Sequence, residues 1–412
     1  MTNRRRFLQL AAGAAAGLSL GDRARIPTVP PAPAEPDEAY WRLVKASFPV
    51  RPGLKMMNAA NLCPSPLAVA AAVTEMTAEI DADASFQNRE RFNERRETAR
   101  SAIARLVGAD ADEIAITRNT SEGNNTVVNG LRLGPGDEVV VWDENHPTNL
   151  LAWQVRSERD GFSVITVGVD PEDDPAAPFL AALSPRTRVL AFSHLSNASG
   201  TLLPAQRLCA EARSRGVLTL VDGAQTFGAL RLDLTSMGCD FYTASSHKWF
   251  LGPKEAGVLF VRRDAQGTAW ASDVGVGWDA ALGGGARKFE NLGQRDDACV
   301  AAMGAAAAIH EQVGTEVIER RVRELGEALR AGLTGSIPGV RFAGPPYPAS
   351  RAGVVVFSWE GMDTRQTFDR LYREFGVAGA PMPSGVRLSP HIYNTLEDIH
   401  AAVEAAAHLA SS

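Results

Sequence analysis

The chain has 412 residues, a formal net charge of −6, 45% hydrophobic residues and 22% charged residues. This length suits roughly two to three domains, and the composition is that of a globular protein with a large core. The negative charge and the lack of a basic stripe with interleaved aromatic residues exclude a nucleic-acid-binding footprint. The four cysteines include no C-x-x-C pair, so the sequence predicts neither a metal site nor a disulfide framework.

The N-terminal segment has the order of an export signal. Three arginines at positions 4–6 precede an apolar run, residues 7–20, that is too short to span a membrane comfortably as a helix. Residues 4–8 resemble a bacterial twin-arginine signal; an uncleaved membrane anchor and a chance basic start are the alternatives. The resemblance implies a periplasmic location, with the twin-arginine translocase as a partner during export. That pathway moves folded proteins, so a cofactor could be loaded first.

Proline-rich residues 27–36 predict an extended linker outside the core, so the folded part should begin near Asp37. Apolar residues at three- and four-residue spacing predict helical structure over residues 66–108. Strands and helices then alternate, which predicts an α/β fold with a mostly parallel sheet covered by helices on both faces. The predicted strands are 113–117, 137–142, 162–168, 187–193, 217–221, 240–244 and 257–261, and residues 149–158 and 205–215 are predicted helices.

The pattern changes after residue 293 and predicts a smaller α+β unit. Its expected elements are helices 296–313 and 315–333, a strand at 353–359, a helix at 364–375, a short strand near Val386 and a final helix at 396–409. The predicted organisation is therefore a signal and linker (1–36), an N-terminal arm joining the small domain (37–65), a large domain (66–293) and a small C-terminal domain (294–412).

Polar clusters follow five of the predicted strands, at the sheet edge where open α/β sheets bind ligands. These clusters are residues 118–123, His146, residues 196–197, residues 222–225 and residues 245–248. Each has an ordinary explanation when taken alone, as a helix cap, a core histidine or a surface lysine. Their coincidence at one edge indicates a single site.

The residue types in these clusters suit pyridoxal 5′-phosphate (PLP), which needs a lysine amine, a carboxylate for its pyridine nitrogen and a phosphate cup. Lys248 can form the Schiff base, and Asp222 can keep the pyridine nitrogen protonated, so these two are candidate catalytic residues together with His146, which can stack on the ring. The remaining candidates are Ser121, Ser245 and His247 for the phosphate, and Asn197 and Gln225 for the ring oxygen.

Five short motifs carry a wider resemblance: residues 120–122, 145–147, 193–200, 221–225 and 245–248, with residues 58–60, 387–389 and 393–395 in support. In this order they resemble the class V aminotransferase group of fold-type I PLP enzymes, which includes isopenicillin N epimerase-like proteins and cysteine desulfurases. The resemblance covers about residues 50–410 and implies a sheet of the seven-stranded type.

The same resemblance assigns further residues. Glu122 would belong to the cofactor site, and Asn58 and Ala59 to the substrate site. Arg387 would grip the substrate α-carboxylate, a task suited to a bidentate guanidinium; a surface ion pair is the alternative for this residue.

Two departures from the family pattern bear on function. Cysteine desulfurases carry a nucleophilic cysteine shortly before the Arg-x-Ser motif, but residues 375–382 contain no cysteine, which disfavours desulfurase activity. The family often has Gly-Thr where this chain has Gly293 and Gln294, with the threonine reaching the phosphate of the other subunit. Gln294 could still donate a hydrogen bond there, and the position suggests a homodimer with shared active sites.

The expected function is PLP-dependent chemistry on a small-molecule substrate, an amino acid or amino-acyl group, in the periplasm. The enzyme would be an aminotransferase or epimerase-like, with C–S or other β-lyase chemistry as the alternative. Arg387 would fix the carboxylate, and Lys248 would act as the base at Cα. A nicotinamide oxidoreductase is disfavoured because residues 275–280 mimic a dinucleotide fingerprint in the wrong context. A serine hydrolase is disfavoured because no G-x-S-x-G elbow exists, whereas a cofactor-binding scaffold without catalysis stays open.

Overall fold

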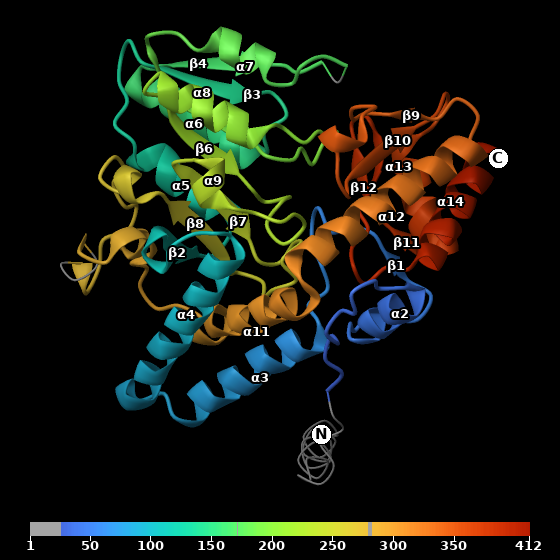
Figure 1. Ribbon diagram of the computed structural model, residues 1–412, viewed down its shortest axis with the longest axis horizontal. Coiled ribbons are helices and arrows are strands. Elements are labelled where there is room, and N and C mark those ends of the chain that lie inside the picture. The colour runs from blue at the N-terminus through green and yellow to red at the C-terminus, as the bar shows by residue number, and fades with distance from the viewer. Residues whose placement is uncertain (1–25, 171, 279–281) are drawn as a thin grey trace, which may run out of the picture.

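The computed structural model describes residues 26–170, 172–278 and 282–412 (Figure 1). Residues 1–25, which hold the predicted twin-arginine signal, lie outside the described residues. Within the described part, no helix is both long and apolar enough to cross a membrane. Residues 26–36 contain no helix or strand, yet they are not a free tether, because Val29 is buried in the core and the Ala32 amide donates to the Gln312 carbonyl at 3.3 Å.

The described residues form helices and strands that follow the predicted alternation. The helices are α2 (Glu38–Ala46), α3 (Leu67–Ala82), α4 (Phe86–Leu106), α5 (Thr120–Gly130), α6 (Pro147–Asp160), α7 (Ala177–Ala182), α8 (Ala205–Ser214), α9 (Leu234–Met237), α11 (Asp297–Val313), α12 (Thr315–Ser336), α13 (Thr364–Phe375) and α14 (Leu396–Ala410). The strands are β1 (Lys55–Met56), β2 (Ile114–Thr117), β3 (Glu138–Trp142), β4 (Ser163–Val167), β5 (Thr187–Ser193), β6 (Leu218–Asp222), β7 (Phe241–Ser245), β8 (Gly257–Val261), β9 (Arg341–Phe342), β10 (Val355–Ser358), β11 (Val377–Ala378), β12 (Ala380–Met382) and β13 (Gly385–Leu388). Short 3₁₀ turns are η1 (Ala111–Glu113), η2 (Arg263–Ala265), η3 (Gly285–Glu290) and η4 (Pro348–Ser350).

The large domain is built on a seven-stranded sheet with the order β2-β8-β7-β6-β5-β3-β4. Strand β8 runs antiparallel to both of its neighbours, and the other neighbouring pairs are parallel. This confirms the predicted mostly parallel sheet. Each of the seven predicted strands is present, with ends that differ by no more than one residue.

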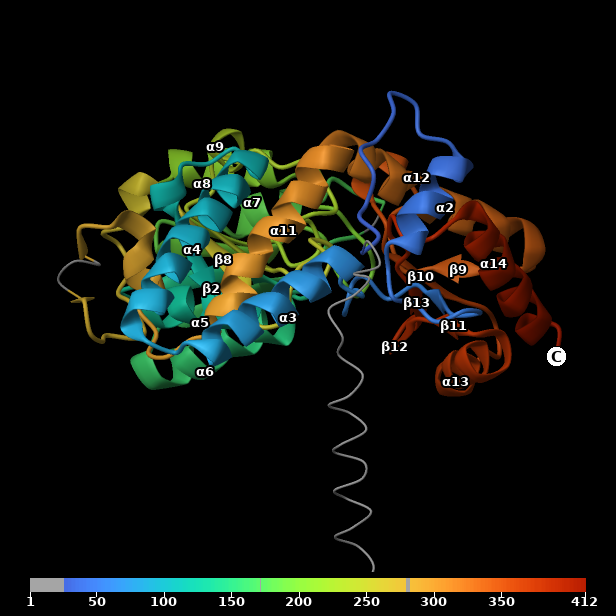
Figure 2. The ribbon, with the colours of Figure 1, turned by 90° about the horizontal axis from the view of Figure 1, so that it is seen from below.

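Alternating side chains of each strand face two separate apolar cores. In β3, Val139 lies in one core and Val140 in the other. Helices α5 and α6 cover the first face of the sheet, while α4, α8 and α11 cover the second (Figures 1 and 2). Trp153 of α6 belongs to the first core and Met303 of α11 to the second. Strands buried on both faces read as continuous apolar runs, which explains why they were predicted well.

The helical structure predicted over residues 66–108 is present and consists of two helices. Helix α3 ends at Ala82, where Asp83 takes an extended conformation, and α4 begins after Ser85. The Ser85 hydroxyl accepts a hydrogen bond from the Asn88 amide at 3.3 Å, and so caps the new helix. The chain therefore reverses direction here, and α3 and α4 pack with α11 as a helical layer (Figure 2).

The small domain contains the antiparallel sheet β12-β13-β10-β9 and the parallel pair β1-β11. The N-terminal arm lies on this domain, because β1 pairs with β11 and Lys45 of α2 forms an ion pair with Asp398 of α14 at 2.7 Å. Helix α2, which was not predicted, is capped by the Asp37 side chain.

The predicted domain boundary at residue 294 differs from the packing. Helix α11 follows this boundary, but it packs on α3 and α4, and Met303 and Ala306 belong to the large-domain core. Helix α12 passes from one core to the other, since Val322 lies in the large core and Leu329 in the small one. The sequence pattern changes at residue 294 because an alanine-rich helix begins there, not because the small domain begins there.

Candidate active site

The register of the parallel strands brings the predicted polar clusters to one edge of the sheet. Asp222, the last residue of β6, lies opposite Ser193 of β5 and Thr243 of β7. Its carboxylate is buried and accepts two hydrogen bonds, from the Ala224 amide at 3.0 Å and from the Asn124 side-chain amide at 2.9 Å. These fixed donors offset part of the cost of burying the charge.

Gly223 has a steric reason to follow Asp222. A Cβ at this position would lie 1.8 Å from Cζ of the Tyr242 ring, so a larger residue would have to displace a buried aromatic side chain. The Tyr242 hydroxyl lies 2.8 Å from the Thr226 hydroxyl and is held in place by that contact. The glycine of the 222–225 motif thus lets the chain after β6 pass close to the buried Tyr242 ring.

A cavity of about 390 Å³ lies between the two domains beside this edge. Its lining combines large-domain residues with residues of the N-terminal arm and the small domain. The lining residues are Asn58, Ala60, Asn61, His146, Asn197, Gln225, Lys248, Phe368, Gly379, Ala380, Pro381, Met382 and Arg387. Six of the predicted residues, distant in the sequence, therefore meet in one volume: Asn58, His146, Asn197, Gln225, Lys248 and Arg387. Asp222, Ser245 and His247 do not line this cavity.

Lys248 lies just after β7 and lines this cavity. Burial lowers the pKa of its amine to about 8; the Asp222 carboxylate opposes this effect and the Arg387 guanidinium adds to it. A substantial fraction of the amine is therefore neutral near pH 8, as a nucleophile or a base requires.

Arg387, on β13, is buried without a carboxylate partner in the described part of the chain. Its guanidinium donates to the Asn197 carbonyl at 3.0 Å and to the Asn58 side-chain oxygen at 3.3 Å, while its Nε has no hydrogen-bond partner. Burial lowers the pKa of this guanidinium to about 10. The surface ion pair that was the alternative for Arg387 does not describe this environment, which leaves the cation facing the cavity.

His146 caps the N-terminus of α6 and also lines the cavity. Its Nδ1 lies 3.3 Å from the Thr148 amide and 3.0 Å from the Thr148 hydroxyl. Burial lowers the pKa of the imidazole, the Lys248 and Arg387 charges lower it further, and Asp222 opposes them. The ring is therefore neutral at pH 7, with Nδ1 as an acceptor and the proton on Nε2.

Gln225 and Asn197 line the cavity, but Gln225 is partly engaged within the protein. Its side-chain nitrogen donates to the Ala60 carbonyl at 2.9 Å, and its oxygen accepts from the Trp249 indole at 2.8 Å. Only its second N–H is left for the cofactor ring oxygen. Asn197 uses its backbone carbonyl to hold Arg387, so its side chain is available to a ligand.

The predicted phosphate residues gather around the N-terminus of α5. The Ser245 hydroxyl accepts from the Thr120 amide at 2.8 Å, and the two hydroxyls lie 2.7 Å apart. Burial, with Lys248 and Lys254 nearby, lowers the pKa of the half-buried His247 to about 4. A helix N-terminus with hydroxyls in its first turn suits a phosphate group.

Ser121 and Glu122 line a neighbouring hollow instead of the Lys248 cavity. The Glu122 carboxylate accepts from the backbone amide of Arg118 at 2.5 Å and from its guanidinium at 2.8 Å. The Glu122 side chain is therefore paired with Arg118 and lies outside the cavity that Lys248 and Arg387 line.

The remaining predicted residues do not line the cavity either. Ala59 is buried, and its amide donates to the Ser389 carbonyl at 3.0 Å, which fixes the backbone beside Asn58. Gln294 is exposed and accepts a hydrogen bond from Arg89 at 3.2 Å.

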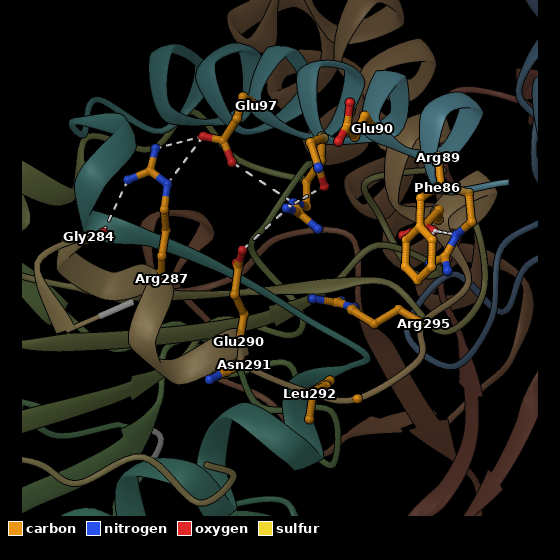
Figure 3. A pocket seen from close by; sticks show the side chains of 14 residues that line it. Phe86, Arg89, Glu90, Glu97, Gly284, Arg287, Glu290, Asn291, Leu292 and Arg295 are labelled. Carbon is orange, nitrogen blue, oxygen red and sulfur yellow. Dashed lines mark hydrogen bonds and ion pairs between the residues drawn. The ribbon is translucent and has the colours of Figure 1, made fainter. Parts of the chain in front are cut away.

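A second polar hollow of about 480 Å³ lies between α4 and η3, and Lys248 is not among its lining residues (Figure 3). Its charged groups largely neutralise one another. Arg287 forms an ion pair with Glu97 at 2.7 Å, and Arg89 forms one with Asp297 at 2.8 Å. The described residues contain no group of three or more side chains suited to a metal ion.

Sequence reasoning missed Asn124 and the small-domain wall formed by Phe368 and residues 379–382. Asn124 lies one helical turn after Thr120, so a helix that begins at the polar cluster 118–123 would place both on one face. The wall had no such signal, because its residues are apolar and their approach to Lys248 depends on how the two domains pack.

Comparison with known proteins agrees with this geometry. The Aminotransferase class-V family model matches residues 63–402. Isopenicillin N epimerase of Streptomyces clavuligerus is 34% identical over 324 residues, which is 73% of this chain and 81% of that protein. A probable cysteine desulfurase of Methanothermobacter thermautotrophicus is 30% identical over 384 residues, which is 86% of this chain and 94% of that protein.

Solved structures agree as well. A C-DES mutant with glycine covalently linked to its PLP cofactor is 26% identical and superposes with a TM-score of 0.82, covering 90% of this chain and 99% of that chain. A second structure of that protein, the cystine C-S lyase C-DES with its reaction product cysteine persulfide, is 27% identical with a TM-score of 0.79, covering 85% of this chain and 97% of that chain.

The lowered pKa of Lys248 predicts the pH dependence of cofactor capture. Because the neutral amine is the nucleophile, PLP uptake by the cofactor-free protein should accelerate as pH rises and level off above about 8, not near the ordinary lysine value of 10.5. Stopped-flow absorbance would measure the rate. In Arg387→Leu the inflection should move to higher pH because a like charge is removed, whereas Arg365→Leu, an exposed arginine on α13, should leave it in place. An inflection near 10.5 would contradict the assignment.

Proposed function

Because the chain belongs to the aminotransferase class-V family of PLP-dependent enzymes, we propose that it acts on the amino-bearing carbon of an amino acid or amino-acyl group, with Lys248 holding the cofactor. The reaction proposed is transamination or epimerisation. Elimination of a β-substituent is the second candidate, since C-DES, described as a cystine C-S lyase, shares the fold over 85% of this chain.

The observation that carries the proposal is the buried, carboxylate-free guanidinium of Arg387 facing the same cavity as Lys248. A desolvated cation is costly unless an anion accompanies it. A substrate α-carboxylate would supply that anion and accept from the guanidinium in a fixed geometry. The amino group of the same substrate would then lie toward Lys248.

The residues at the sheet edge fit PLP. Asp222 would accept a hydrogen bond from the pyridine nitrogen, and the N-terminus of α5 with Ser245 would hold the phosphate. When bound, the cofactor supplies an electron sink that makes the substrate Cα–H acidic. Lys248 would take the Cα proton, since its pKa of about 8 lets the amine accept and return a proton near neutral pH.

The neutral His146 would lie against the cofactor ring without adding positive charge, because its Nδ1 accepts from Thr148. Loss of the amino group to give a keto acid would define transamination. Return of a proton to the opposite face of Cα would define epimerisation.

Desulfurase chemistry is disfavoured by the position and state of the thiols. Residues 379–382, which line the cavity before the Arg387 strand, contain no cysteine. Cys63 is buried, its sulfur lies 3.5 Å from the Tyr393 hydroxyl, and burial raises its pKa to about 12. A thiol with this pKa carries almost no thiolate at neutral pH. Because curated relatives include cysteine desulfurases, cysteine belongs in any substrate panel.

The reaction branch can be read from products formed in deuterated water. The purified holoenzyme is incubated with a panel of amino acids, cysteine and cystine included, and the products are analysed by mass spectrometry. Deuterium at Cα with the amine retained supports epimerisation, and a keto acid supports transamination. Pyruvate with a sulfur product supports lyase chemistry, and alanine with sulfide would overturn the argument against desulfurase activity.

Two variants test the residue roles. Lys248→Ala should lose the visible absorbance of the bound cofactor and the activity; a variant that keeps both would remove the basis of the proposal. Arg387→Leu should lower kcat/KM by roughly 30-fold or more, because truncating one partner of a buried charge pair costs about 2–5 kcal/mol. Arg365→Leu is the matched control, since that exposed arginine of α13 lies outside the cavity lining.

We also propose that the enzyme is exported by the twin-arginine route to the periplasm, on the basis of residues 4–8. Replacing Arg4 and Arg5 by lysine should retain the protein in the cytoplasm, as cell fractionation would measure. The same replacement at Arg23 and Arg25 keeps the charge count equal and should leave export intact. Equal periplasmic yield from both paired variants would contradict this route.

We further propose a homodimer in which a second copy covers the large-domain surface near Gln294. Exposed apolar side chains support it: Phe86 is 83% exposed, Val274 66% and Val276 101%, more than an isolated globular chain usually leaves in water. Sedimentation at micromolar concentration should give twice the mass of the chain. A species of single-chain mass would contradict the dimer.

A further inference from the structure

A fully buried asparagine, Asn124 on α5, contacts the proposed cofactor residue Asp222 and two threonines beside it. Its side-chain nitrogen lies 2.9 Å from Oδ2 of Asp222 and 3.4 Å from the Thr148 hydroxyl. Its side-chain oxygen lies 2.6 Å from the Thr243 hydroxyl. One amide thus has all its strong hydrogen-bonding positions used in the interior.

The orientation of this amide follows from its partners. A carboxylate only accepts, so the Asn124 nitrogen must face Asp222, and the Thr243 hydroxyl must donate to the Asn124 oxygen. The second N–H of the amide points at the Thr148 oxygen. Thr148 can therefore donate its own hydroxyl proton to Nδ1 of His146, 3.0 Å away.

Close packing of α5 on β7 makes these contacts reachable. At the preceding residue, Gly123, an added Cβ would lie 2.9 Å from Cγ2 of Thr243, closer than such atoms approach. The missing side chain lets the first turn of α5 descend onto the strand, and the next side chain then reaches the end of β6. If a side chain at residue 123 held α5 further from β7, the Asn124 amide could no longer donate to Asp222.

We propose that Asn124 is a positioning residue that couples the two contacts to the cofactor ring, holding Asp222 directly and His146 through Thr148. This inference rests on the proposed function, because it assigns the pyridine nitrogen to Asp222 and the ring face to His146. The coupling keeps the carboxylate aimed at the nitrogen and keeps the imidazole neutral, with Nδ1 as an acceptor. Asn124 itself touches neither the substrate nor the reacting atoms.

The first test uses the cofactor's own nitrogen as a reporter. In holoenzyme loaded with ¹⁵N-labelled PLP, the pyridine nitrogen should show the chemical shift of the protonated form. In Asn124→Leu, which is similar in size and lacks the amide, the signal should move toward the unprotonated position, and PLP retention should weaken roughly ten- to hundredfold, the loss of one charge-assisted hydrogen bond. Asn129→Ala, on the exposed side of the same helix, should change neither readout.

The second test distinguishes the direct contact of Asn124 with Asp222 from its indirect contact with His146 through Thr148. It does not rely on activity. The charged groups that face His146 are Lys248, Asp222 and Arg387. The Thr148 hydroxyl donates to Nδ1 and so stabilises the unprotonated ring. Thr148→Val removes this donor, so the His146 pKa measured by imidazole NMR should rise. The pyridine signal should stay in place in that variant, whereas Asn124→Leu should disturb both signals.

A third variant guards against a folding defect in Asn124→Leu. Asn124→Asp keeps the shape but sets a second carboxylate against Asp222, so the pair holds one proton at low pH and loses it as pH rises. The protonated form can still donate to Asp222, so PLP retention should approach wild type in acid and fall with increasing pH, with an unchanged far-UV circular dichroism spectrum.

The outcomes distinguish this inference from the proposed function. If Lys248→Ala abolishes cofactor absorbance while Asn124→Leu leaves the pyridine shift and PLP retention at wild-type values, the coupling is wrong and the cofactor assignment stands. If Lys248→Ala keeps both the cofactor absorbance and the activity, the proposed function itself fails. A pH-independent Asn124→Asp with wild-type retention would also overturn the coupling.

Discussion

The site depends on an imbalance of charge in a buried volume. Lys248 and Arg387 face the same cavity, and the Asp222 carboxylate acts on Lys248, where it opposes the lowering of the amine pKa. Burial lowers the pKa of both cations, which measures how poorly the protein alone stabilises them. Anionic ligands relieve this cost, and a low dielectric makes the attraction stronger than it would be in water. The same electrostatics suit a phosphate-bearing cofactor and a carboxylate-bearing substrate.

The fold creates this imbalance through the register of its parallel strands and through two places where a glycine lets the backbone pack closely against a neighbouring side chain. The ends of β5, β6 and β7 are aligned, so residues separated by tens of positions share one edge. Gly223 avoids the Tyr242 ring, and Gly123 lets α5 descend onto β7. The small domain then completes the cavity with Arg387, delivered on a strand of a separate sheet.

Much of this arrangement could be predicted from the sequence, and the failures share a cause. Strands buried on both faces are recognisable in the sequence as apolar runs. The polar residues that follow them mark the edge of the sheet where ligands bind, and His146, Asp222 and Lys248 were predicted in this way. Asn124 was missed because its role depends on which strand its helix packs against. The break before α4 was missed because a serine cap inside a helical pattern is a weak signal. The assignment of α11 to the small domain failed because composition, not packing, guided the boundary.

The pairing of β12 with β13 has a mechanical consequence. Ala380 lies opposite Arg387 in this antiparallel pair, so the apolar wall of the cavity and the guanidinium are joined by backbone hydrogen bonds. Any rigid shift of that sheet carries both together. A change in the distance between Arg387 and Lys248 would therefore also change how closely the apolar wall lies to Lys248.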